Sequence, residues 1–187
     1  MKREGKTMVK IRPATESDAD ALLKIYTPYI TNTTITFEKD IPTLDDFRQR
    51  IRDISQNFPY IVAVDDDDQI LGYAYAHLYG PRAAFAWTVE ASIYLDHNFE
   101  GHGLGTMLYK KLEDILTKQG VVNLMACVTE ENLNSIKFHE KLGYKVVGVF
   151  PKTGFKFNRW LDITWLQKTL NDKSENMKPI TPWKELD

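Results

Sequence analysis

The sequence predicts a single mixed α/β domain, in which helices flank a central, mostly antiparallel sheet. Stretches with alternating or continuous apolar residues, typical of strands, are interleaved with stretches whose apolar residues recur every three or four positions, as in helices. A glycine-rich segment, residues 101–105, joins a predicted strand to a predicted helix. The chain has 187 residues, which suits one domain, and we place that domain at residues 8–170.

The first part of the chain predicts one strand followed by two helices. Residues 8–11 are expected to form a short strand. Thr15 and Asp18 resemble a capping box at the start of a helix that reaches about residue 29. Thr43 and Asp46 open a second helix in the same way, and it extends to about residue 56.

The rest of the chain predicts six strands and two helices. The acidic run from Asp65 to Asp68 lies between two strand patterns, which favours a solvated hairpin turn over a metal site. The helix after residue 105 carries apolar residues such as Leu108 and Leu112 on one side. The other elements are strands at 60–64, 70–78, 86–95, 121–128, 144–155 and 160–166, and a helix at 132–142.

Composition argues against several classes of protein. A formal net charge of -2 lacks the basic excess of nucleic-acid-binding domains, and no stretch approaches the ~20 apolar residues of a membrane span. The lone Cys127 lies in a strand pattern and cannot form an internal disulfide. The charged residues 1–7 do not resemble a signal peptide. We therefore expect a cytoplasmic protein with polar tails at 1–7 and 171–187, the second mobile or loosely docked.

The glycine-rich segment predicts a site for an anion. Gly101, Gly103 and Gly105 let the backbone approach a ligand closely, and the following helix would add its N-terminal dipole. The spacing fits neither a P-loop nor a dinucleotide-binding fingerprint. Taken alone, the segment is equally compatible with a plain tight turn.

A glutamate stands in the predicted strand before this segment. Thr88, Glu90, Ser92 and Tyr94 share one face of that strand. Burying an unpaired carboxylate is costly, so Glu90 needs either a catalytic role or an ion pair, for which Arg82 is the nearest candidate. Both alternatives stay open. His139, in the predicted helix at 132–142, taken by itself favours a structural role.

Together, these motifs resemble the GNAT superfamily of acyl-CoA-dependent N-acetyltransferases, and more closely its phosphinothricin and methionine sulfoximine N-acetyltransferase branch. The resemblance implies a sheet with a splayed pair of parallel strands. The matching segments are Ile11-Arg12-Pro13-Ala14, Thr36-Phe37-Glu38, Gly72-Tyr73-Ala74-Tyr75-Ala76, Pro81-Arg82-Ala83-Ala84, Trp87-Thr88-Val89-Glu90, Gly101 to Gly105, Asn132 to Tyr144, Gly154-Phe155-Lys156 and Arg159-Trp160-Leu161-Asp162.

The resemblance implies acetyl-CoA as the cosubstrate and no metal. Backbone amides of the glycine-rich segment would hold the pyrophosphate, and a strand edge would pair with the pantetheine arm. A free N–H near Leu95 would polarise the thioester carbonyl. The implied cofactor-binding residues are Ile93, Tyr94, Leu95, Gly101, His102, Gly103, Leu104, Gly105, Thr106, Asn132 and Ser135. Glu100 departs from the family, which usually has Arg or Gln there, and a carboxylate would repel the pyrophosphate unless it points to solvent.

The resemblance also implies catalytic roles for Glu90, as general base, and for His139, near the leaving thiolate. The implied substrate-binding residues are Phe37, Glu38, Arg82, Trp87 and Thr88. The expected partners are a small amino-acid-like amine and a second copy of the chain, in a homodimer. Two alternatives remain: the same chemistry on a protein N-terminus or another amine, and an acyl-CoA-binding regulator without catalysis.

Overall fold

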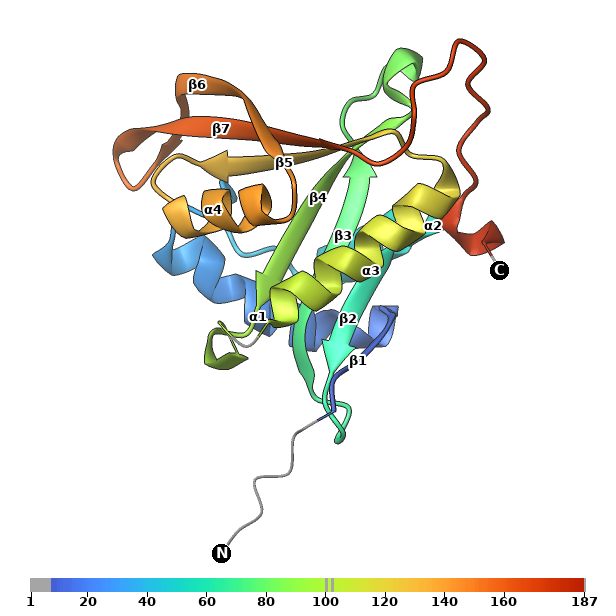
Figure 1. The fold of residues 1–187 in the computed structure, drawn as a ribbon. Helices are drawn as coiled ribbons and strands as arrows, with labels where there is room; N and C mark the ends of the chain where they lie inside the picture. The colour runs from blue at the N-terminus through green and yellow to red at the C-terminus, as the bar shows by residue number, and fades with distance from the viewer. Residues whose placement is uncertain (1–7, 100, 102, 187) are drawn as a thin grey trace, which may run out of the picture.

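The fold confirms the predicted mixed sheet with flanking helices. A computed structural model describes residues 8–99, 101 and 103–186. Across these residues seven strands form one sheet in the order β1-β2-β3-β4-β5-β7-β6 (Figure 1). Every neighbouring pair is antiparallel except β4 and β5, which are parallel. The strands are β1 (Lys10–Pro13), β2 (Tyr60–Val64), β3 (Ile70–Leu78), β4 (Thr88–Leu95), β5 (Asn123–Thr129), β6 (Lys145–Lys156) and β7 (Arg159–Thr169).

Helices cover both faces of the sheet. In Figure 1, α3 crosses one face over β2, β3 and β4, and α1 and α2 lie behind the sheet. The α-helices are α1 (Ala19–Asn32), α2 (Leu44–Asn57), α3 (Leu104–Gln119) and α4 (Leu133–Lys141). Short 3-10 turns are η1 (Glu16–Asp18), η2 (Ala83–Phe85), η3 (His97–Phe99) and η4 (Trp183–Glu185).

The helix starts predicted from capping residues are confirmed. Thr15 and Asp18 form a capping box at η1, which leads directly into α1, and the Thr43 hydroxyl accepts the amide of Asp46 at α2. α2 then buries Phe47 and Ile51, and each buried side chain of this size contributes roughly 1.5–3 kcal/mol. β4 begins at Thr88, two residues later than predicted, because Ala86 caps η2 and the chain turns at residues 86–87.

The parallel pair at the centre of the sheet is short and then diverges. Residues Thr88–Glu90 of β4 pair with Asn123–Met125 of β5, and the pairing stops there although both strands continue. Each strand is held on its other side: β4 pairs with β3 over seven positions, and β5 pairs with β7 over seven positions. The gap between β4 and β5 therefore stays open without loss of either strand.

The C-terminal segment packs on the domain as far as Leu186. The buried Gln119 side-chain amide donates to the carbonyls of Asn57 and Thr181, both at 2.7 Å. Ile180, Trp183 and Leu186 pack against the core cluster beneath α3. The sequence predicts a mobile or loosely docked tail at 171–187; within it, residues 180–186 are docked, because their apolar side chains pack between α2, α3 and β1.

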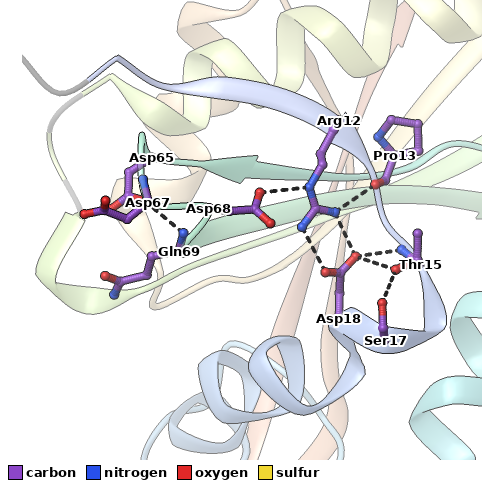
Figure 2. A network of polar contacts seen from close by, with 9 residues as sticks. All are labelled: Arg12, Pro13, Thr15, Ser17, Asp18, Asp65, Asp67, Asp68 and Gln69. Carbon is purple, nitrogen blue, oxygen red and sulfur yellow. Dashed lines mark hydrogen bonds and ion pairs between the residues drawn. The ribbon is translucent and has the colours of Figure 1, made fainter.

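A polar network ties the N-terminal strand to its neighbours (Figure 2). Arg12 donates two hydrogen bonds to the Asp18 carboxylate, at 2.9 and 3.0 Å, and one to Asp68 at 3.3 Å. Asp68 belongs to the acidic run, which forms the predicted β2–β3 turn. Burial would raise the pKa of Asp18, but hydrogen bonds from Arg12 and Thr15 outweigh burial and lower it.

We predict that Asp18→Asn lowers the free energy of unfolding at neutral pH by about 1–3 kcal/mol, since charged hydrogen bonds are lost. A lowered carboxyl pKa stabilises the folded state above the unfolded pKa, and this contribution disappears as the pH falls below about 4. Urea unfolding of wild type and Asp18→Asn between pH 3 and pH 7 measures this, with Asp67→Asn, at an exposed residue of the β2–β3 turn, as control. If the free energy of unfolding differed by the same amount between wild type and Asp18→Asn at all pH values, the prediction would be contradicted.

Candidate active site

Glu90 lies on β4, half-buried, at the last position where β4 and β5 pair. Burial raises the pKa of Glu90, and the charge of His77 on β3 partly offsets this effect. Arg82 is exposed on the loop before β4, and the described residues give Glu90 no ion pair with it. The ion-pair interpretation of Glu90 is therefore wrong, and a half-buried carboxylate with a raised pKa is suited to accepting a proton near neutral pH.

A narrow pocket of about 60 Å³ lies where β4 and β5 diverge. Five of the residues implicated by sequence line it: Ile93, Tyr94, Asn132, Ser135 and His139. Beyond Glu90, alternate residues of β4 direct their backbone groups into the gap, because no strand pairs there. The walls thus offer unpaired strand backbone, which suits an extended, amide-containing ligand such as a pantetheine arm.

The amide of Leu95 differs from its expected role. Its N–H donates to the Tyr29 hydroxyl at 3.3 Å, and that hydroxyl donates to the Leu95 carbonyl at 2.7 Å. The Leu95 N–H is therefore not free to polarise a thioester, and an oxyanion donor has to come from another residue of β4 in the gap. The sequence could not reveal this, because Tyr29 is 66 residues away on α1.

The glycine-rich segment forms the start of α3. Gly101 and Gly103 have φ values of +82° and +80°, which favour glycine, and nothing lies within 4 Å of a Cβ added at either. Gly105 is buried and a Cβ there would meet Phe138 at 3.3 Å, while the side chain of Leu104 points into the core. Gly103, Leu104, Gly105 and Thr106 are thus placed to act on an anion through the helix N-terminus. His102 and Glu100 lie outside the described residues.

His139 is buried, 3% exposed, and hydrogen-bonded through both ring nitrogens. Its Nδ1 lies 2.8 Å from the Ser135 carbonyl, which can only accept, so Nδ1 carries a proton. Burial lowers the pKa of His139, although the bond with Ser135 acts in the opposite direction. In the neutral ring Nε2 is an acceptor, and the Tyr109 hydroxyl, 2.8 Å away, donates to it.

Several of the predicted acceptor-binding residues make contacts within the protein. The ring of Phe37 packs directly on Gly154, where a Cβ would overlap it. Glu38 pairs with Arg50 at 2.8 Å, so its carboxylate already has a cationic partner. The Trp87 indole donates to the Lys178 carbonyl at 2.7 Å, which places the C-terminal segment over this end of β4.

Thr88 and Arg82 lie near the start of β4. The Thr88 hydroxyl accepts from the Asn123 side chain at 3.2 Å, across the parallel pair. Arg82 is exposed and caps η2 with its backbone. Of the five predicted acceptor-binding residues, Arg82 therefore keeps a charged group available to a ligand.

Two further groups at this site, Tyr109 and Glu131, are not identified by the sequence. Tyr109 lies on α3 within an otherwise apolar helix face, and only its contact with His139 indicates a functional role. Glu131 accepts two hydrogen bonds from Arg159, at 2.7 and 2.8 Å, and one from Thr34. This link fixes the loop after α1 so that Ile35 lines the pocket. Neither signal is visible in the sequence, because each joins residues far apart in the chain.

Other chemistry is poorly supported within the described part of the chain. There, no three His, Cys, Asp or Glu side chains are grouped as metal ligands. Cys127 faces the pocket from β5, and burial raises the pKa of its thiol to about 12, so it remains protonated. None of the described helices has the length and apolar character needed to cross a bilayer.

The chain is similar to known proteins over most of its length. Residues 11–165 match the family described as an acetyltransferase (GNAT) domain. A phosphinothricin N-acetyltransferase of Streptomyces coelicolor is 31% identical over 169 residues, covering 89% of this chain and 99% of that protein. An L-methionine sulfoximine/L-methionine sulfone acetyltransferase of Pseudomonas aeruginosa is 34% identical over 165 residues, covering 86% and 94%. The crystal structure of a GNAT superfamily phosphinothricin acetyltransferase from Sinorhizobium meliloti, in complex with AcCoA, has a TM-score of 0.86 at 31% identity and covers 94% of this chain and 98% of that one.

Proposed function

Because the chain belongs to the GNAT acetyltransferase family, we propose that it moves the acetyl group of acetyl-CoA to the amino group of a small amino-acid-like molecule, such as phosphinothricin or methionine sulfoximine. One observation carries this proposal. The half-buried Glu90 carboxylate lies on the same strand as the open backbone of the pocket, directly before the pocket begins. A base and a site for a thioester are therefore adjacent.

The cosubstrate would supply the activated acetyl group, and this chain would hold it at two places. The N-terminus of α3, with Gly101 and Gly103, fits the pyrophosphate. Ile93 fits the pantetheine arm through its backbone, which faces the gap, whereas the backbone of Tyr94 faces β3 and Tyr94 lines the pocket beside it. The Asn132 side-chain oxygen already accepts the Ser135 amide at 3.2 Å, so a contact from Asn132 would come from its Nδ2.

Glu90 would remove a proton from the acceptor. Most aliphatic amines are protonated at neutral pH and cannot attack a carbonyl until they lose that proton. The raised pKa of Glu90 makes its carboxylate a stronger base than an exposed glutamate. The resulting neutral amine would attack the thioester carbonyl directly, with no acyl-enzyme step on Cys127, whose thiol stays protonated.

Tyr109 and His139 would stabilise the leaving thiolate. The neutral His139 has given its N–H to Ser135, so it has no proton to offer the sulfur. The Tyr109 hydroxyl does carry one, and burial raises the pKa of Tyr109, so the hydroxyl donates a hydrogen bond without ionising. His139 then serves as the alternative acceptor that holds the Tyr109 hydroxyl in place.

The exposed guanidinium of Arg82 suits the carboxylate or phosphinate of such an acceptor. The C-terminal segment reaches Trp87, at the start of β4, through the Lys178 carbonyl. It would leave less room there for a protein N-terminus than for a compact amine. We retain the expectation of a cytoplasmic enzyme, which fits the single free thiol of Cys127.

We also propose a homodimer, formed through β6. This strand is at the edge of the sheet and, with β7, exposes apolar side chains that a second copy could cover. The exposed residues are Val146, Val147, Val149, Phe150, Phe155, Phe157 and Trp160.

The enzymatic proposal predicts thiol release from acetyl-CoA when purified protein meets methionine sulfoximine, methionine sulfone or phosphinothricin. Glu90→Gln should lower kcat/KM by roughly 100-fold or more, because it removes the base and keeps the shape. Glu140→Gln, an exposed residue on α4, serves as the control. Binding of acetyl-CoA without transfer to these acceptors, other amines or peptides would contradict the proposal and favour a regulator.

The dimer proposal predicts that Phe150→Asp converts the protein to a monomer in analytical ultracentrifugation, because a charge cannot be buried unpaired at an apolar interface. Phe150 is 50% exposed. Ile41, between α1 and α2, is 48% exposed, so Ile41→Asp is a matched control that should stay dimeric. A monomeric wild-type protein, or a dimeric Phe150→Asp variant, would refute this interface.

A further inference from the structure

The proposed reaction releases one proton per turnover, and Glu90 has to discharge it. An ammonium acceptor and a thioester give an amide, a thiol and one proton. Glu90 is half-buried beside the pocket, so its proton needs a route to solvent. We propose that Glu90 passes this proton to His77 on β3, and that the two residues form a relay pair; this inference rests on the proposed function.

The sheet places the two side chains opposite each other. In the antiparallel pairing of β3 with β4, His77 is directly across from Glu90. Directly opposite residues in such a pair share one face of the sheet, with Cβ atoms about 4.5–5.5 Å apart. The ring of His77 also lies 6.1 Å from that of Tyr75, on the same face. The described residues form no direct ion pair between Glu90 and His77, so the relay requires a bridging water between the two side chains.

The hydrogen bond of His77 orients its ring for this role. Nδ1 lies 2.9 Å from the carbonyl of Leu78, which can only accept, so Nδ1 carries a proton. In the neutral ring Nε2 is then the free acceptor. Leu78, the last residue of β3, is 42% exposed, so this end of the strand reaches the surface. A proton taken up at Nε2 is therefore close to solvent.

The other groups around Glu90 do not offer such a route. From β5, Met125 is uncharged and burial raises the pKa of the Cys127 thiol to about 12. From α3, burial raises the pKa of Tyr109, which stays neutral. Tyr75 of β3 also has a raised pKa, again because of burial. Among the groups that face Glu90, this leaves the imidazole of His77, whose Nε2 can take up a proton and give it away.

The relay moves one proton from the acceptor to solvent in two transfers. The Glu90 carboxylate takes one proton from the acceptor ammonium and becomes a carboxylic acid. That acid gives the proton, through water, to Nε2 of His77, which becomes an imidazolium and releases it to solvent. The second proton of the amine nitrogen ends on the thiol as the C–N bond forms and the C–S bond breaks.

The test compares wild type with His77→Gln and His77→Lys, using acetyl-CoA and an acceptor that wild type acetylates. His77→Gln should lower kcat on the order of tenfold, and the acidic limb of its kcat/KM profile should move to higher pH, because no cation then opposes the effect of burial on Glu90. His77→Lys restores a cation, so its limb should return to the wild-type pH or below. Added imidazole should restore kcat in His77→Ala.

Two outcomes would count against the relay. Superimposable pH profiles and equal kcat for wild type and His77→Gln would overturn it. The relay would also be overturned if the acidic limb of the kcat/KM profile shifted in His77→Gln but imidazole did not restore kcat in His77→Ala. His77 would then act on Glu90 by charge alone. Inactive wild-type protein with every acceptor would instead refute the proposed function itself, and that result is distinguishable from the other two.

Discussion

The structure depends on the early divergence of β4 from β5. Two parallel strands that pair over three positions and then separate leave backbone donors and acceptors facing a gap in the middle of a sheet. Such groups are costly to bury unpaired, so the gap is tolerable only if water or a ligand fills it. β3 and β7 hold the two strands from outside, and the α3 N-terminus, Tyr109 and His139 are all positioned around the opening.

Around this gap, burial moves acid and base groups in opposite directions. The pKa of Glu90 rises and that of His139 falls, because burial disfavours the charged form of each. The first becomes a better base, and the second stays neutral and takes the hydrogen bond of Tyr109. In the proposed mechanism, the same physical effect would prepare one end of the pocket to remove a proton and the other to stabilise a leaving group.

Local sequence patterns predicted the elements well, since capping residues and apolar periodicity act within a few residues. Thr43 at the start of α2 and the acidic β2–β3 turn are examples. The family resemblance identified residues that do line the pocket, such as Asn132 and His139. Contacts over long separations were not predictable: Tyr29 occupies the Leu95 amide, and Gln119 anchors the C-terminal segment through Thr181. No local pattern encodes such pairs, because tertiary packing decides which polar groups meet.

The most direct test of the central claim is hydrogen exchange of the backbone amides with and without acetyl-CoA. If the gap holds the thioester arm, the amides of Ala91 and Ile93 on β4 and those at the start of α3 should become protected, while β1 and β2 stay unchanged. The larger groove of about 570 Å³ beside Arg12, Lys24 and Asp96 provides the contrast. Protection there, with β4 unchanged, would contradict the account.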